Sequence, residues 1–177
     1  MNDTPRIFGI AGWKNSGKTR MTAALVAELS ARGWTVSTIK HAHHAFDIDR
    51  ENTDSWQHRQ AGAAEVAIVS QRRWALMHEN RQDEDEPSLD EILGRLSPCD
   101  LVLVEGYKSA RHAKIEMRRN LSTTKARLSD TDPGIVAIVT DDPKNAATNL
   151  PVFGHDDIAA IADLVERRSG LVKDSAA

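Results

Sequence analysis

Cysteine, aromatic residues and long hydrophobic runs are all scarce in this chain of 177 residues. The single cysteine, Cys99, excludes an internal disulfide framework and fits a reducing compartment. No apolar run approaches the ~20 residues that a transmembrane helix needs, and the first residues lack the basic and apolar pattern of a signal peptide. We therefore expect a cytoplasmic protein that does not enter a membrane.

An excess of charge of one sign is lacking as well. The 23 lysines and arginines nearly balance the 26 aspartates and glutamates, the formal net charge is −3, and no long basic run is present. A nucleic-acid partner is therefore not expected. Because long linkers and internal repeats are also missing, the length predicts one domain over residues 1–177, with residues 169–177 as a loose tail.

A glycine-rich stretch near the start of the chain fits the phosphate-binding loop pattern G-x-x-x-x-G-K-[ST] at every fixed position. Its glycines let the main chain turn tightly and point N–H groups at phosphate oxygens, and the positive end of the following helix adds to that field. Lys18 is expected to reach the β- and γ-phosphates, and the Thr19 hydroxyl to bind Mg²⁺. The stretch consists of Gly12, Trp13, Lys14, Asn15, Ser16, Gly17, Lys18 and Thr19.

The sequence on both sides of this loop supplies the context that the pattern requires. Residues 6–11 form a short apolar run typical of a buried strand. After the loop, Met21, Leu25 and Leu29 recur every four residues, and Gly33 stands where a helix commonly ends. A glycine-rich turn without a ligand is the alternative, and the flanking strand and helix favour a nucleotide phosphate site.

A buried strand predicted over residues 101–104 leads directly to a carboxylate. Four consecutive apolar residues without alternation indicate a strand covered on both faces, as in a parallel sheet. Glu105 follows at once, where nucleotide sites place a group that holds Mg²⁺ or orients a water. A strand-end carboxylate in solvent is the alternative.

A polar stretch over residues 40–50 follows another predicted strand, residues 34–40. It holds His41, His43 and His44 together with Asp47 and Asp49. We favour Asp47 or Asp49 as an addition to the Mg²⁺ shell, because the nucleotide already requires this ion. A transition metal bound by the histidines and a plain solvated loop are the two alternatives.

Thr140 and Asp141 follow a third buried strand, predicted over residues 135–139. A carboxylate there can accept hydrogen bonds from the N1–H and 2-amino groups of guanine, a pattern that adenine does not offer. An Asx turn before Pro143 is the alternative.

The remaining elements follow from periodicity and turn signals. Strands are predicted at residues 65–70, 74–77 and 114–118, and helices begin near Asp54, at a capping box opened by Ser88, and near Asp156. Alternation of polar and apolar residues predicts a half-exposed or edge strand at 114–118. The fold class is therefore α/β: a three-layer P-loop NTPase fold, with a mainly parallel sheet flanked by helices and an antiparallel or edge-strand extension.

Several motifs occur together in one order, which resembles the molybdopterin-guanine dinucleotide biosynthesis protein B (MobB) family. The resemblance covers nearly the whole chain and is weakest at residues 120–132. Tyr107 stands where phenylalanine is expected, and Trp13, Lys14 and Asn15 are bulkier than the small residues often found in the loop. The motifs are residues 12–19, residues 40–44 with Asp47 and Asp49, Asp54-Ser55 with Ala61-Gly62-Ala63, residues 73–77, and Val104-Glu105-Gly106-Tyr107-Lys108.

The resemblance implies a GTP-binding protein with weak intrinsic hydrolysis, from a branch of P-loop proteins that commonly form dimers. The family assists the guanylyltransferase that attaches GMP to molybdopterin. By position, Mg²⁺ would lie near Thr19 and Glu105 with Asp47 or Asp49, and the base near Thr140 and Asp141.

Three hypotheses for function result. The first is a GTP-binding accessory protein with slow GTPase activity, because no general base is evident and Arg59 and Arg111 are candidate catalytic cations only by being basic. The second is a small-molecule kinase or ATP-dependent ligase, in which Lys40, His41 and Asp47 bind the acceptor. The third is a carrier of molybdopterin or molybdate that uses the nucleotide as a switch. In each, strands 74–77 and 114–118 are candidate edges for a homodimer.

Overall fold

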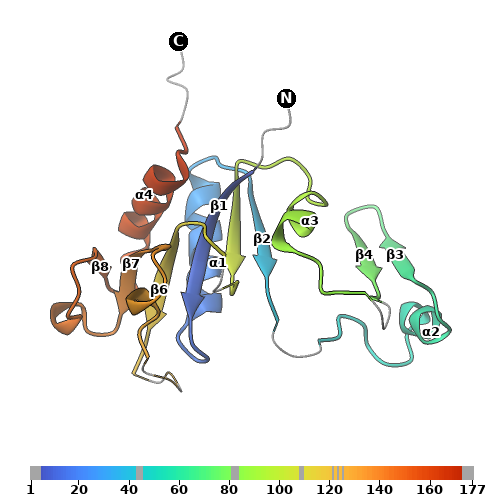
Figure 1. Cartoon of the computed structure of the whole chain (residues 1–177). Coiled ribbons are helices and arrows are strands. Elements are labelled where there is room, and N and C mark those ends of the chain that lie inside the picture. Colours follow the sequence, from blue (N-terminus) through green and yellow to red (C-terminus); the bar gives the residue numbers. More distant parts are fainter. Residues whose placement is uncertain are drawn as a thin grey trace, which may run out of the picture. The chain divides into compact units, whose positions relative to one another are not determined.

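The computed structural model describes residues 5–42, 46–80, 84–107, 110–120, 122, 124 and 126–172. They form two compact units (Figure 1). The larger unit contains the residues up to His41 and those from Leu96 onward, and the smaller unit runs from Ala42 to Arg95. The prediction of one domain over residues 1–177 stays a prediction. His43, His44 and Lys108 lie outside the described residues.

A six-stranded sheet forms the centre of the larger unit, with strand order β2-β5-β1-β6-β7-β8 and parallel pairing throughout. Parallel strands bring their carboxyl ends to one edge, where ligands bind in open α/β sheets. The mainly parallel sheet of the predicted fold class is confirmed. The strands are β1 (Arg6–Gly12), β2 (Val36–Lys40), β5 (Leu101–Glu105), β6 (Lys114–Arg118), β7 (Ile135–Thr140) and β8 (Val152–Phe153).

Two helices, α1 (Lys18–Ala31) and α4 (Ile158–Ser169), pack on the same cluster of sheet side chains. Alternate residues of the strands face this cluster, among them Phe8 and Ile10 of β1. Each fully buried side chain of this size contributes roughly 1.5–3 kcal/mol. The larger unit also has two 3₁₀ helices, η1 (Leu128–Asp130) and η2 (Pro143–Asn145).

Strand β6 is central, and the prediction of a half-exposed or edge strand was wrong. It lies between β1 and β7, and its first four residues are buried. Its polar residues are paired inside the protein: Lys114 bonds the Asp132 carboxylate at 2.8 Å and the Ala110 carbonyl. Glu116 accepts a hydrogen bond from Arg118 at 2.8 Å. The polar residues that alternate with apolar ones in β6 are therefore members of buried ion pairs and do not face solvent. Because β6 lies inside the sheet, it offers no edge for a homodimer.

The smaller unit contains the antiparallel extension that the sequence predicts. Strands β3 (Glu65–Val69) and β4 (Trp74–His78) pair as a hairpin, and Val66 and Met77 are its buried cross-strand pair. Helices α2 (Asp54–Gln60) and α3 (Leu89–Leu93) belong to the same unit, and the Ser88 capping box is present. Within the described residues, no helix is long and apolar enough to span a membrane.

Candidate nucleotide-binding site

The loop between β1 and α1 has the backbone that a phosphate site needs. Gly12, Asn15 and Gly17 have positive φ angles of 148°, 64° and 91°, and the Ser16 N–H donates to the Trp13 carbonyl at 3.2 Å, which closes a tight turn. No side chain caps the first turn of α1, and no acidic residue lies there. The N–H groups at this helix start can therefore serve an anion.

Close packing inside the loop explains why its first glycine is required. A Cβ atom on Gly12 would lie 2.5 Å from the Ser16 hydroxyl and 2.7 Å from the Met117 carbonyl oxygen. The Ser16 hydroxyl is itself buried without a hydrogen-bond partner. The Lys18 ammonium donates to the Trp13 carbonyl at 2.9 Å, so it reaches across the loop.

Thr19 and Glu105, two residues predicted to bind Mg²⁺, are in direct contact. The Thr19 hydroxyl donates to the Glu105 carboxylate at 3.0 Å, although 86 positions separate them. The Lys40 ammonium lies 3.7 Å from the same oxygen, and the Glu105 side chain is 9% exposed. A hydroxyl and a carboxylate oxygen at one point are donors that suit Mg²⁺, which keeps several waters and takes few protein ligands. The pair therefore fits the ion.

His41 lies beside this pair at the end of β2. Its main-chain N–H donates to the Glu105 carbonyl at 2.9 Å, and its ring centroid is 4.7 Å from that of Tyr107. Within the described part of the chain, no group of three or more histidine, cysteine or acidic residues could hold a metal ion.

Asp47 and Asp49 are tied to an arginine of the smaller unit. Both Asp47 oxygens accept from the Arg59 guanidinium, at 2.9 and 3.0 Å. Asp49 lies 3.2 Å from Arg59 and accepts from the Ser55 hydroxyl at 2.9 Å. A role for either aspartate in the Mg²⁺ shell stays a prediction.

The Asp141 carboxylate connects the ends of three neighbouring strands. It accepts the Asn120 main-chain N–H at 2.8 Å and lies 3.3 Å from His155 and 3.5 Å from Arg119. The Asn120 hydrogen bond, together with electrostatic interactions with His155 and Arg119, holds the pKa of Asp141 below its usual value. An ionised Asp141 therefore organises this edge of the sheet, and its contact with a base stays a prediction, as does that of Thr140.

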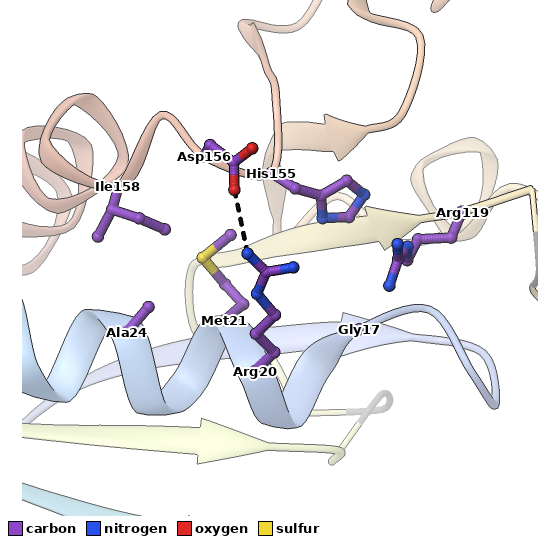
Figure 2. Close-up of a pocket in the computed structure, with 8 residues that line it drawn as sticks. All are labelled: Gly17, Arg20, Met21, Ala24, Arg119, His155, Asp156 and Ile158. Atoms are coloured by element: carbon purple, nitrogen blue, oxygen red, sulfur yellow. Dashed lines mark hydrogen bonds and ion pairs between the residues drawn. The ribbon is translucent and has the colours of Figure 1, made fainter.

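A small cavity of about 80 Å³ adjoins the start of α1 (Figure 2). Arg119 and His155 lie over Gly17, the residue just before α1: a Cβ on Gly17 would be 3.2 Å from Arg119 Cδ and 3.8 Å from His155 Cε1. Arg20 lines the same cavity and pairs with Asp156 at 3.2 Å. Our sequence analysis missed Arg119 and His155. The position of His155 just after β8 was the available signal, because ligands bind at the ends of parallel strands.

Together, the parallel sheet, the loop after β1 and the Thr19–Glu105 pair define the fold class of P-loop NTPases. A family model described as "Molybdopterin guanine dinucleotide synthesis protein B", MobB, matches residues 7–141. The chain belongs to the MobB family.

Relatives and solved structures agree with this assignment. The chain is 36% identical over 161 residues to the "Molybdopterin-guanine dinucleotide biosynthesis adapter protein" of Escherichia coli, covering 90% of each sequence. It is also 36% identical over 166 residues to the protein of the same name from Haemophilus influenzae, covering 94% of this chain and 90% of that protein. The crystal structure of Bacillus subtilis MobB aligns with a TM-score of 0.72 and 26% identity, over 92% of this chain and 97% of that one.

Proposed function

We propose that this protein binds GTP with Mg²⁺ and acts as an accessory protein in the synthesis of molybdopterin-guanine dinucleotide. The names of its relatives support the pathway. The observation that carries the nucleotide is the contact between Thr19 and Glu105, beside an uncapped helix start. In this proposal the loop main chain and Lys18 bind the phosphates, and Thr19 and Glu105 hold the ion. Bound Mg²⁺ would neutralise charge on the β- and γ-phosphates.

Hydrolysis of GTP by the protein alone is proposed to be slow. Lys18 and Lys40 supply positive charge, and Thr19 and Glu105 position the ion. Charge neutralisation and positioning are the main requirements of phosphoryl transfer. The partner is the molybdenum cofactor guanylyltransferase, with molybdopterin as the shared substrate. Adding that enzyme is expected to raise the hydrolysis rate. An unchanged rate at saturating partner would contradict an accessory role in hydrolysis.

The test of nucleotide binding is a calorimetric titration of GTP and of ATP with Mg²⁺. We expect tighter binding of GTP, and Lys18→Ala is expected to weaken both nucleotides about ten-fold or more, because it removes charge-assisted hydrogen bonds to phosphate. Arg168→Ala, an exposed position on α4, is the matched control. Unchanged affinity in Lys18→Ala would refute the phosphate site, and equal binding of ATP and GTP would refute the base preference.

Asp141→Ala tests the proposed base site, provided that the two nucleotides are compared. The substitution also removes the contacts to Asn120, His155 and Arg119, so both affinities are expected to fall. If Asp141 also contacts guanine, the substitution should lower the affinity for GTP further than the affinity for ATP. The ratio of the GTP affinity to the ATP affinity therefore reports base recognition. An unchanged ratio would show that Asp141 only holds this edge of the sheet together and does not contact the base.

A homodimer is part of the proposal, supported by the exposed face of the β3–β4 hairpin. Val69 and Trp74 are cross-strand neighbours, Leu76 follows on the same face, and their exposed fractions are 75%, 67% and 50%. An apolar patch of this kind favours a protein partner. Light scattering is expected to give a dimer. Trp74→Ser should weaken this dimer, whereas the control Val172→Ser, at a position that is 76% exposed, should leave it unchanged. A monomer at all concentrations would contradict the proposal.

A further inference from the structure

Lys40 lies at the carboxyl end of β2, directly beside the carboxylate that ends β5. The two strands are parallel neighbours, and their register pairs Lys40 with Glu105. The Lys40 ammonium lies 3.7 Å from Glu105 Oε1, the same oxygen that accepts the hydrogen bond of the Thr19 hydroxyl. A lysine therefore faces the carboxylate oxygen that is in contact with Thr19.

The main chain on both sides of this contact is held in place. The His41 N–H donates to the Glu105 carbonyl at 2.9 Å, and the Gly106 N–H donates to the Ile10 carbonyl at 3.2 Å. Gly106 has a φ of 98°, and a Cβ atom there would lie 3.0 Å from the Cβ of His41. The ends of β2 and β5 cannot separate without breaking these contacts, so the main chain keeps Lys40 next to Glu105.

The two side chains differ in how firmly they are held. The Glu105 side chain is 9% exposed, and a carboxylate so far removed from water needs a positive partner. The Lys40 side chain is 61% exposed, and its distance of 3.7 Å exceeds the range of about 2.7–3.2 Å for a hydrogen bond. An exposed lysine in such a contact is displaced at little cost. The pair therefore joins a fixed anion to a cation that can move.

An ion bound by Thr19 and Glu105 would bring two positive charges to the oxygen that Lys40 faces. Like charges at this distance repel, and next to a buried carboxylate water screens them less than in solution. Lys40 therefore opposes the binding of Mg²⁺ on its own. The phosphates of a nucleotide carry several negative charges, which attract both cations and offset the repulsion between them.

We propose that Lys40 takes the place of Mg²⁺ at Glu105 whenever no nucleotide is bound. It neutralises the carboxylate, which would otherwise repel an incoming phosphate, and it lowers the affinity of the site for Mg²⁺ alone. Lys40 is thus a positioning residue that makes Mg²⁺ binding depend on the nucleotide. The proposal rests on the proposed site for GTP and Mg²⁺ and adds the residue that couples the two ligands.

Lys40→Met tests the proposal with Mg²⁺ as the only ligand, because it removes the charge and keeps a long side chain. Binding of Mg²⁺ to the whole chain is followed by NMR chemical shifts. We expect the affinity to rise about ten-fold, because the repulsion between lysine and ion is lost. Lys40→Arg should keep the weaker affinity of the unaltered protein. Unchanged or weaker Mg²⁺ binding in Lys40→Met would overturn the proposal.

Lys144→Met is the matched control, because it removes the same charge at an exposed position of η2. It should leave the affinity for Mg²⁺ alone unchanged. A gain as large as that in Lys40→Met would overturn the proposal, because the effect would then follow from net charge and not from the contact with Glu105.

Calorimetric titration of GTP, once with Mg²⁺ and once with EDTA, gives a second result. Lys40→Met should weaken GTP about ten-fold without the ion, because a charge that attracts phosphate is lost, and less with it, because the ion repels Lys40. Equal losses in both conditions would overturn the proposal, since a merely structural role predicts them. If the unaltered protein binds no GTP, the proposed function fails, whereas the Mg²⁺ titration still decides whether Lys40 opposes the ion.

Discussion

Replacement of Gly12 by alanine should cost far more than the same change at Gly33. Both glycines have positive φ angles, 148° and 92°, which cost alanine about 1–2 kcal/mol. At Gly33 the added methyl group meets nothing within 4 Å. At Gly12 it would lie 2.7 Å from the Met117 carbonyl oxygen, which belongs to the buried main chain of β6 and cannot move away cheaply.

Overpacking of this kind adds about 1–3 kcal/mol, so Gly12→Ala should lower the free energy of unfolding by about 2–5 kcal/mol. For a chain of this size, 1 kcal/mol changes Tm by about 2–4 °C. Thermal unfolding followed by circular dichroism should therefore show a loss of about 10 °C for Gly12→Ala and about 4 °C for Gly33→Ala. GTP affinity should fall only in the first variant. Equal Tm losses, or full GTP affinity in Gly12→Ala, would refute the packing argument.

Three further predictions concern charged groups. Asp132→Ala removes the charged partner of the fully buried Lys114 ammonium, which keeps the Ala110 carbonyl as an acceptor, and should cost about 3–5 kcal/mol in urea unfolding. Lys114→Met should cost less because Asp132 is 20% exposed; equal costs would contradict this. Burial and the charge of Lys114 lower the pKa of His112 to about 4, below its ordinary 6.5. The unfolded chain therefore binds more protons between those values, and stability should fall by about 1–2 kcal/mol as pH drops from 6.5 to 4, with a flatter profile in His112→Gln. Glu105→Gln should weaken GTP binding about ten-fold with Mg²⁺ and little without it, as measured by calorimetry; equal losses in both conditions would exclude a metal role.

The elements that could be predicted from the sequence are those fixed by local pattern. The phosphate-binding pattern from Gly12 to Thr19 consists of consecutive residues, so it can be recognised directly in the sequence. The apolar runs of β1, β5 and β7 are simply interpreted as buried strands. The contact between Thr19 and Glu105 was also predictable, although it spans 86 positions. Glu105 ends β5, and Thr19 lies in the first turn of the helix that follows the neighbouring parallel strand β1, so topology brings the two residues to the same edge of the sheet.

The elements that could not be predicted depend on pairing between distant charges. An argument from periodicity places polar residues in solvent. Lys114 and Glu116 are exceptions, because each is buried and has a hydrogen-bond partner inside the protein. Arg119 and His155 come from two separate loops, one after β6 and one after β8, and no sequence pattern links them. Residues 120–132 show no periodicity in the sequence, which therefore gave no signal for the hydrogen bond from the Ser122 hydroxyl to the Lys14 carbonyl.

Three carboxylates at or near the carboxyl ends of strands in the sheet have one structural role in common. Glu105 of β5 binds the Thr19 hydroxyl, Glu116 of β6 binds the N–H groups that open η1, and Asp141 after β7 binds the Asn120 N–H. Each fixes a segment that borders the site or one of its cavities. An acidic residue at such a strand end is therefore weak evidence for catalysis by itself. Glu105 stands apart because its partner, the Thr19 hydroxyl, is a group that can also bind Mg²⁺.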